Sequence, residues 1–279
     1  MWHSKLALIA LLSTTPALAG VGGPPIAYTK GSVKGDAIYL VHPDGTGLTK
    51  LYQTTTSPRN FGGKIERLAF LPGGGEVAFT QDSVLLRVQK HHANGQPNGP
   101  AYNVTVPNNR CALGDVDYRA DGTLVVSDGC FNVWVVPPGG TAATKLFSTA
   151  ENIGAVRWMR DGSVLIHSGP LEAMRLRRWS SGTFNTIAPT TYFPPFLGMS
   201  RIANETAISD RSTYKVVDLS TGSARAGCKP AGNVRLSPTS SQILYRSSTG
   251  YLFVQKADCS GAAYRLAMGV GDALEWRAN

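Results

Sequence analysis

Charged residues are scarce in this chain, and the common signatures of enzyme chemistry are missing. Asp, Glu, Lys and Arg make up 16% of the 279 residues, below the usual quarter of a globular chain. The sequence holds no C-x-x-C, H-E-x-x-H or G-x-S-x-G motif, which removes the usual marks of thiol redox centres, zinc hydrolases and α/β-hydrolases. Glycine (31) and proline (17) are abundant and favour many tight turns over long helices. We therefore expect an all-β fold.

Long apolar runs are also missing, apart from a short one near the N-terminus. Residues 1–19 read MWHSKLALIALLSTTPALA. The positive Lys5, the apolar run after it and the small residues Ala17 and Ala19 form the pattern of a secretory signal peptide. The run is far shorter than the roughly twenty residues that cross a bilayer. We expect residues 20–279 to be a mature chain with no membrane span, exported to the periplasm or out of the cell.

The expected export also bears on the state of the four cysteines. An exported chain meets an oxidising compartment, where an even number of cysteines indicates two disulfides rather than a metal site. Cys111 precedes the first strand of a repeat and Cys130 follows the second, so both lie at one end of that repeat and are expected to pair. Cys228 and Cys259 are then left to each other, although their places in the repeat put them at opposite ends of the strands.

A repeat of about forty residues runs through the chain. Each unit opens with two short apolar strands around a turn rich in Gly, Asp, Pro and Ser, in residues 67–81, 116–128, 156–168, 198–210 and 234–246. A second β-rich pair belongs to each unit, in residues 37–52, 133–147, 174–188, 214–228 and 251–267. The repeat that begins at residue 67 carries instead a strand at 84–88 and a longer loop at 91–100. Four short strands per unit are predicted.

The two ends of the chain complement each other. Residues 25–30 look like the second strand of a unit that lacks its first, and residues 274–276 look like a first strand without successors. A ring in which the last strand joins the first unit would remove the exposed sheet edges. We predict a six-bladed β-propeller of four-stranded blades, closed in this way and forming one domain over residues 20–279.

Three turns carry a resemblance to a known repeat. Asp44-Gly45-Thr46-Gly47, Arg119-Ala120-Asp121-Gly122-Thr123 and Arg160-Asp161-Gly162-Ser163 resemble the Asp-Gly turns of the TolB-type, WD-like β-propellers. The resemblance concerns the propeller part of that family only. It implies a propeller fold and a binding scaffold, and as a functional signature it is weak.

Histidine offers one candidate for catalysis. His167 ends the second strand of a repeat, and we keep it as the enzyme-like candidate because it could face the central channel. His91 and His92 lie in a polar loop without metal-ligand spacing and are expected to be solvated. The sequence therefore predicts no metal and no cofactor.

Basic residues exceed acidic ones. Without Lys5, 26 of the 27 Lys and Arg remain against 18 Asp and Glu. The candidate binding residues are Arg175, Arg177 and Arg178, which form a basic run, together with Arg157. They could attract an anionic glycan or a protein partner, but alternating arginines on a strand also suit a solvated face. Export argues against nucleic acid.

Further charges fall on the predicted inner strands. Asp115, Asp117, Arg157 and Glu275 would approach the channel, either to hold a polar ligand or to close the channel by salt bridges. The leading hypothesis is an exported, non-enzymatic and monomeric scaffold that binds a protein or another ligand. The alternative is a propeller lyase or hydrolase acting on an extracellular glycan or lactone.

Overall fold

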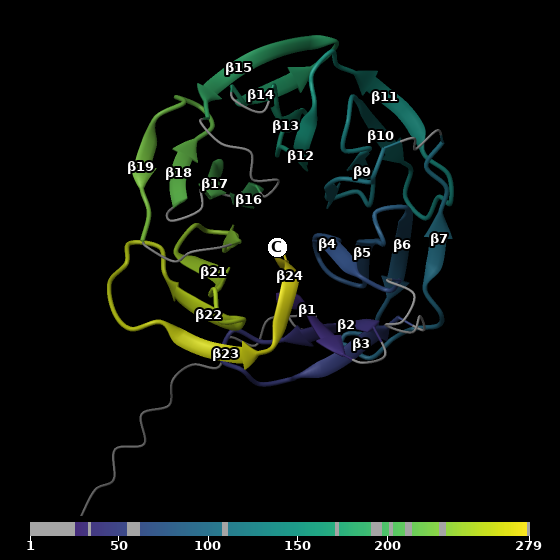
Figure 1. Cartoon of the computed structure of the whole chain (residues 1–279), viewed down its shortest axis with the longest axis vertical. Helices are drawn as coiled ribbons and strands as arrows, with labels where there is room; N and C mark the ends of the chain where they lie inside the picture. The colour runs from purple at the N-terminus through teal and green to yellow at the C-terminus, as the bar shows by residue number, and fades with distance from the viewer. Residues whose placement is uncertain are drawn as a thin grey trace, which may run out of the picture.

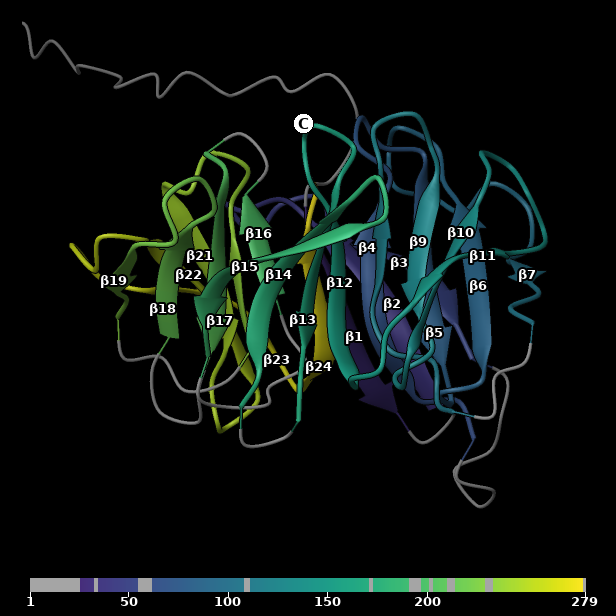
Figure 2. The ribbon, with the colours of Figure 1, turned by 90° about the horizontal axis from the view of Figure 1, so that it is seen from above.

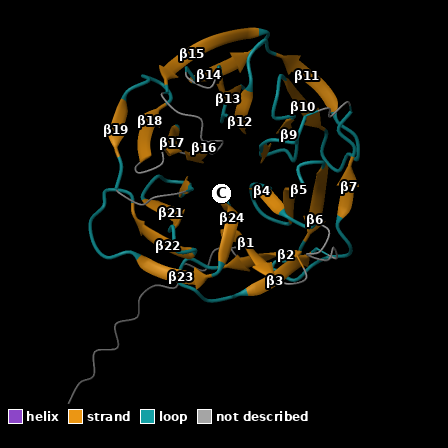
Figure 3. Cartoon of the chain, in the orientation of Figure 1, coloured by secondary structure: helices purple, strands orange, loops and turns teal. Residues whose placement is uncertain are grey.

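The chain builds a ring of β-sheets. The computed structural model describes residues 26–32, 35–54, 62–107, 111–170, 173–190, 197–200, 203–209, 214–228 and 233–277; the expected signal peptide lies outside them. Six four-stranded antiparallel sheets surround a central axis like the blades of a propeller (Figures 1 and 3). No helix occurs in these ranges, and hence none that could span a bilayer. The predicted six-bladed propeller is confirmed.

Blades 1 to 3 occupy the first part of the chain. Named from the inner to the outer strand, blade 1 contains β24 (Val270–Trp276), β1 (Ile26–Ser32), β2 (Gly35–Val41) and β3 (Thr49–Gln53). Blade 2 contains β4 (Ile65–Phe70), β5 (Glu76–Gln81), β6 (Leu85–Lys90) and β7 (Tyr102–Val104). Blade 3 contains β8 (Val116–Tyr118), β9 (Leu124–Ser127), β10 (Asn132–Val136) and β11 (Thr144–Ser148).

Blades 4 to 6 follow in the same order. Blade 4 contains β12 (Ile153–Trp158), β13 (Val164–Ser168), β14 (Arg175–Ser180) and β15 (Thr183–Pro189). Blade 5 contains β16 (Leu197–Ser200), β17 (Glu205–Ser209), β18 (Tyr214–Asp218) and β19 (Ala224–Ala226). Blade 6 contains β20 (Val234–Leu236), β21 (Gln242–Arg246), β22 (Tyr251–Lys256) and β23 (Tyr264–Met268).

Blade 1 joins the two ends of the described chain. β24 supplies its inner strand and pairs antiparallel with β1, with Ile26 opposite Trp276 and Tyr28 opposite Leu274. β1 pairs with β2 on its other side. The ring therefore closes as predicted, because the edge of β1 that would otherwise be open is covered by β24.

The apolar core lies between the blades. Each of the six buried clusters takes residues from two neighbouring sheets; one, for example, packs Ile38 and Leu40 of blade 1 against Leu68 and Phe79 of blade 2. Both faces of every blade are thus covered, which explains why β13 is buried along its whole length. Full burial of such a side chain contributes about 1.5–3 kcal/mol, so the packing of blade on blade stabilises the closed ring.

The Asp-Gly turns shape one end of the blades. The Asp121 carboxylate accepts a hydrogen bond from the Thr123 amide (3.0 Å), and Asp161 accepts one from the Ser163 amide (3.0 Å). The glycine after each aspartate has positive φ, +89° at Gly122, where a side chain would be strained. These residues therefore fix the turn between the first and second strands of blades 3 and 4.

Both expected cysteine pairs lie at disulfide distance, with S–S separations of 2.07 Å. Cys111–Cys130 links two segments of blade 3. Cys228 follows β19 of blade 5 and Cys259 lies after β22 of blade 6, so this bridge joins two blades. The expectation that they lie at opposite ends is wrong, because it assumed that all four strands of a blade run along the ring axis. Sheet twist turns each outer strand along the perimeter toward the next blade, as β15 shows in Figure 2.

We expect each disulfide to contribute about 3 kcal/mol to the free energy of unfolding, because it lowers the conformational entropy of the unfolded chain. The paired substitutions Cys111→Ser with Cys130→Ser, and Cys228→Ser with Cys259→Ser, should each lower stability by this amount in urea unfolding. The differences from the wild type should vanish in excess dithiothreitol. Free Cys111 in non-reducing peptide mapping would contradict the first pairing.

Candidate functional site

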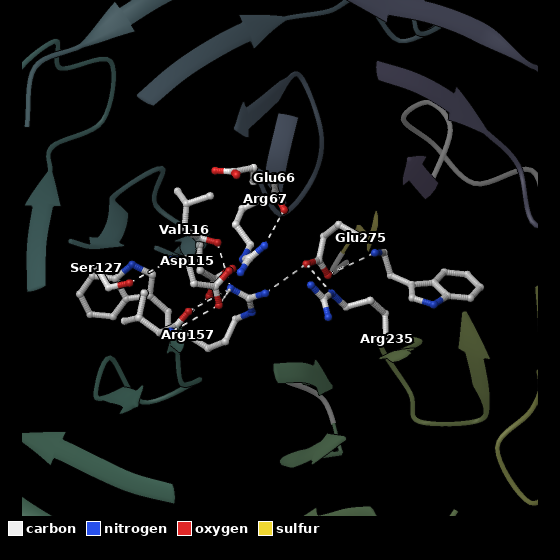
Figure 4. A network of polar contacts seen from close by, with 12 residues as sticks. Glu66, Arg67, Asp115, Val116, Ser127, Arg157, Arg235 and Glu275 are labelled. Carbon is white, nitrogen blue, oxygen red and sulfur yellow. Dashed lines mark hydrogen bonds and ion pairs between the residues drawn. The ribbon is translucent and has the colours of Figure 1, made fainter. Parts of the chain in front are cut away.

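One position of the repeat gathers charge at the ring axis. The last-but-one residue of the inner strands, in blade order, is Glu275, Ala69, Asp117, Arg157, Met199 and Arg235. The acids belong to blades 1 and 3, and the arginines belong to blades 4 and 6. Figure 4 shows Glu275, Arg157 and Arg235 converging on one another, with Asp115 and Arg67 beside them. We call Asp115, Asp117, Arg157, Arg235 and Glu275 the axial cluster.

Arg157 and Asp115 form the shortest ion pair of the axial cluster. Arg157 Nη1 lies 2.5 Å from Asp115 Oδ2, and only 3% and 1% of the two side chains are exposed. The same nitrogen donates to the carbonyl oxygens of Val116 and Val156, each at 3.0 Å. A buried charge is tolerated when it is paired and hydrogen-bonded in this way.

A second ion pair crosses the channel. Arg157 Nη2 lies 3.5 Å from Glu275 Oε2, and these residues come from blades 4 and 1, which stand opposite each other in the ring (Figure 1). Glu275 Oε2 also lies 3.2 Å from Nε of Arg235 in blade 6. Side chains from across the ring therefore meet at the axis, and the channel is closed at this level.

The two aspartates of blade 3 also hold the backbone of blade 4. Asp117 Oδ2 accepts a hydrogen bond from the Trp158 amide (2.7 Å), and Asp115 Oδ2 accepts one from the Val156 amide (3.3 Å). Ser127 Oγ accepts a hydrogen bond from the Asp115 amide (3.0 Å). These carboxylates join inner strands that belong to different sheets, a connection that the sheets' own hydrogen bonds do not make.

Burial and pairing act in opposite directions on these charges. Burial lowers the pKa of Arg157, but the Asp115 and Glu275 carboxylates outweigh it and hold that pKa above its ordinary value. Burial prevails at Arg235, whose pKa is lowered although Glu275 opposes the shift. Burial likewise raises the pKa of Glu275 against the two arginines. The charged state of the axial cluster thus depends on its members remaining together.

The charges around the axis balance. Arg67 of β4 adds a third guanidinium to Arg157 and Arg235, and its Nη1 donates to the Glu66 carbonyl (2.8 Å). Three arginines face three carboxylates, those of Asp115, Asp117 and Glu275. A balanced, buried set attracts no net counter-charge. Of the two uses considered for these residues, the geometry favours closure of the channel by salt bridges.

His167 lies apart from the axial cluster. It is fully buried in β13, and its Nε2 is 2.7 Å from Thr190 Oγ1, just after the outer strand β15. Burial lowers its pKa to about 4, so the ring is neutral at physiological pH. The imidazole thus points to the outer part of blade 4. In the described ranges no group of three or more His, Cys, Asp or Glu is arranged to hold a metal ion.

The basic run is mostly engaged within its own blade. Arg177 Nη1 lies 2.7 Å from Glu151, and the Arg177 guanidinium stacks 4.7 Å from the Phe184 ring. Arg178 forms an ion pair with Asp161, and Arg175 is exposed. This arrangement fits the solvated-face interpretation of the run. The structure brings Arg157 to the axis, away from these three.

Sequence reasoning missed Arg67 and Arg235. Arg235 occupies the same position as Arg157 and Glu275, directly before the last residue of its strand. Comparing this position across all six repeats would have found it. Arg67 lies two residues before Ala69, and it is therefore aligned with Asp115, which lies two residues before Asp117. A comparison of that position across the repeats would have found Arg67.

We expect Arg157→Met to lower the free energy of unfolding by about 3–5 kcal/mol, because it leaves the buried Asp115 carboxylate unpaired. Adding Asp115→Leu should restore much of that loss. The matched control is Arg225→Met, which breaks an exposed pair with Glu205 (2.9 Å) and should cost under about 1 kcal/mol. Equal urea midpoints for Arg157→Met and the wild type would refute this role.

His167 should make stability depend on pH. Its pKa of about 4 in the folded chain lies below the unfolded value of 6.5, so between these values the unfolded chain binds the extra proton. Stability is therefore lost as the pH falls through this window, by about 3 kcal/mol from pH 7 to pH 4. His167→Gln should lack this component in urea unfolding, whereas the exposed control His92→Gln should follow the wild type. Parallel curves for His167→Gln and the wild type would disprove it.

Comparison with known proteins supports the fold. No family model and no curated protein matches the chain. The crystal structure of TolB from Acinetobacter baumannii is similar over 93% of this chain and 68% of that one, with a TM-score of 0.71 and 14% identity. The Cps50 (Swd1) β-propeller domain of Myceliophteria thermophila is similar over 93% and 90%, with a TM-score of 0.56 and 10% identity. At these identities the likeness concerns the fold alone, and that fold is a TolB-type six-bladed β-propeller.

Proposed function

We propose that this chain is an exported scaffold of one propeller domain that binds a protein partner through one face of the ring. The observation that carries the proposal is a group of exposed apolar side chains, Val84, Leu85 and Phe131, at two neighbouring hairpin tips. They are 55%, 38% and 44% exposed. We call these three residues the apolar patch. Large apolar side chains gathered on a surface are typical of protein interfaces.

The first tip is held in a strained shape. Asp82 and Ser83 both have positive φ, 54° and 58°, in the turn closed by the Val84 amide and the Gln81 carbonyl (3.2 Å). Such a turn favours glycine, and a left-handed non-glycine residue costs about 1–3 kcal/mol. Such a backbone conformation persists only where surrounding contacts stabilise it. In this conformation the side chains of Val84 and Leu85 are exposed to solvent.

Contacts around the tip supply that fixation. Asp82 Oδ1 accepts hydrogen bonds from the amides of Gly63 (2.6 Å) and Lys64 (2.8 Å). Ser83 Oγ donates to Glu66 Oε2 (2.5 Å), and the Ser83 carbonyl accepts the Leu113 amide (2.6 Å). The last bond connects the tip to blade 3.

The second tip lies next along that connection. Cys111, two residues before Leu113, is bonded to Cys130, which directly precedes Phe131. Asp128 Oδ1 accepts the Phe131 amide (3.0 Å), and the Phe131 carbonyl accepts the Thr149 amide (2.7 Å). Both tips are therefore held in place before any partner arrives, which reduces the entropy cost of binding.

Charge argues for a protein rather than an anionic glycan. The axial cluster is balanced in charge once Arg67 is included, and it closes the channel. Arg177 and Arg178 already have carboxylate partners. Two disulfides and the TolB-type fold fit a protein outside the cytoplasm. Function as a scaffold needs no catalytic group, and neutral His167 is bonded to Thr190 away from the axial cluster.

The test places a photo-crosslinking residue at Phe131 in cells that produce this protein. The mature chain should be found outside the cytoplasm and begin at Gly20, and one partner should crosslink at Phe131. With that partner purified, Phe131→Asp and Val84→Asp should each weaken binding at least about tenfold, or about 1.4 kcal/mol.

Two exposed apolar residues elsewhere serve as controls. Met268→Asp in β23 and Leu48→Asp before β3 alter side chains that are 57% and 60% exposed and should leave the affinity unchanged. Equal crosslinking at Met268, or wild-type affinity in Phe131→Asp, would reject the apolar patch. Turnover of a polysaccharide, ester or lactone that His167→Gln abolishes would favour the enzyme alternative.

A further inference from the structure

Arg277 is a buried cation in which two hydrogen-bonding nitrogens have no partner among the described residues. It follows the end of β24, which runs to the centre of the ring in Figure 1, and it is only 5% exposed. Its Nε and Nη1 are buried, and neither has a hydrogen-bond partner within the part of the chain that the structure describes. Burial lowers the pKa of this guanidinium. An unpaired buried charge is costly, so an acceptor is to be expected here.

The repeat contains a matched arginine that has its acceptor. Arg119 stands in blade 3 directly after the last residue of β8, as Arg277 does after β24. Arg119 Nε and Nη2 donate to the two Asp121 oxygens at 3.0 and 2.6 Å. In the sequence alignment of the repeats, Arg119-Ala120-Asp121 corresponds to Arg277-Ala278-Asn279, so an asparagine is aligned with the aspartate that pairs with Arg119.

His91 supplies a second unused nitrogen near this place. It is 5% exposed, its ring meets Phe70 at the end of β4 edge to face (6.4 Å), and β4 neighbours β24 in the ring. Nδ1 lies 2.8 Å from the His92 carbonyl and donates to it, which leaves Nε2 buried and without a partner. Arg277 and His91 thus flank the end of β4 at one face of the ring.

We propose that Arg277, assisted by His91, binds a carboxylate group brought by a ligand or partner. The class of ligand follows from blade 3, where the equivalent arginine position binds a carboxylate of the chain itself. The site lies at the ends of the inner strands, whereas the apolar patch lies at the tips between second and third strands, on the opposite face. The two sites can therefore fail independently.

Binding at this site should take up a proton. Burial lowers the pKa of His91, and the positive charges of Arg277 and His92 add to that effect, while the His92 carbonyl and Glu76 oppose it. Glu76 is itself bonded to the Tyr118 hydroxyl (3.0 Å) and lies 3.6 Å from Lys90 Nζ. A carboxylate beside Arg277 and His91 favours the protonated imidazole, so affinity should rise as the pH falls.

The probe is acetate, added to the full chain at constant ionic strength made up with sodium chloride. The ¹⁵N signal of Arg277 Nε should shift in a saturable manner, and acetate should raise Tm because it binds the folded state. Binding should be tighter at pH 5.5 than at pH 8. Arg277→Met should remove the Tm response, whereas the matched control Arg119→Met should keep it.

The proposal is overturned if acetate leaves the Arg277 signal unmoved, if both variants respond alike, or if phosphate shifts that signal and acetate does not. Equal affinity at both pH values would exclude His91 from the site.

Discussion

The pairing of β24 with β1 is the constraint on which the rest of the molecule depends. Because blade 1 takes its inner strand from one end of the described chain and its other strands from the opposite end, closing the ring completes a sheet and covers its edge. The same pairing completes the two apolar clusters that flank blade 1. It also carries Glu275 to the axis opposite Arg157. Edge protection, core packing and closure of the channel therefore follow from one strand.

Apolar residues hold neighbouring blades together around the ring, and charged residues connect blades at the ring axis. Around the ring, each blade packs on the next through side chains such as Val164 and Leu165, which project from opposite faces of β13 and are fully buried. Toward the axis the inner strands come together, and blades 1, 3, 4 and 6 place arginines and carboxylates there, whereas Ala69 and Met199 hold the equivalent position in blades 2 and 5. Ion pairs join blades 1, 3, 4 and 6 at this point. Paired charges have directional partners, and such pairing can specify which strands meet.

The sequence predicted the fold more completely than the site. Turn residues such as Asp121-Gly122 and alternating strands repeat at a regular spacing, so blade number and ring closure could be read from the pattern. The contact of Arg157 with Glu275 joins two strands that lie on opposite sides of the ring. The sequence pattern within one repeat does not give the distance between side chains of different blades. His167 ends a second strand and could have faced the channel, but its imidazole is directed to Thr190 after the outer strand β15, a contact that the repeat pattern does not contain.

Departures from the repeat are informative because the other blades supply the comparison. Asp82 and Ser83 adopt the backbone that glycine would take, and the contacts that hold them there leave Val84 and Leu85 exposed. Arg277 is aligned with Arg119 of blade 3, but the sequence has Asn279 in place of the aspartate that pairs with Arg119. Places where a local rule fails are expected at functional sites. The two proposed binding places follow from this argument, because the turn at Asp82 and Ser83 takes a backbone that favours glycine, and Arg277 lacks the aspartate that pairs with Arg119 in blade 3.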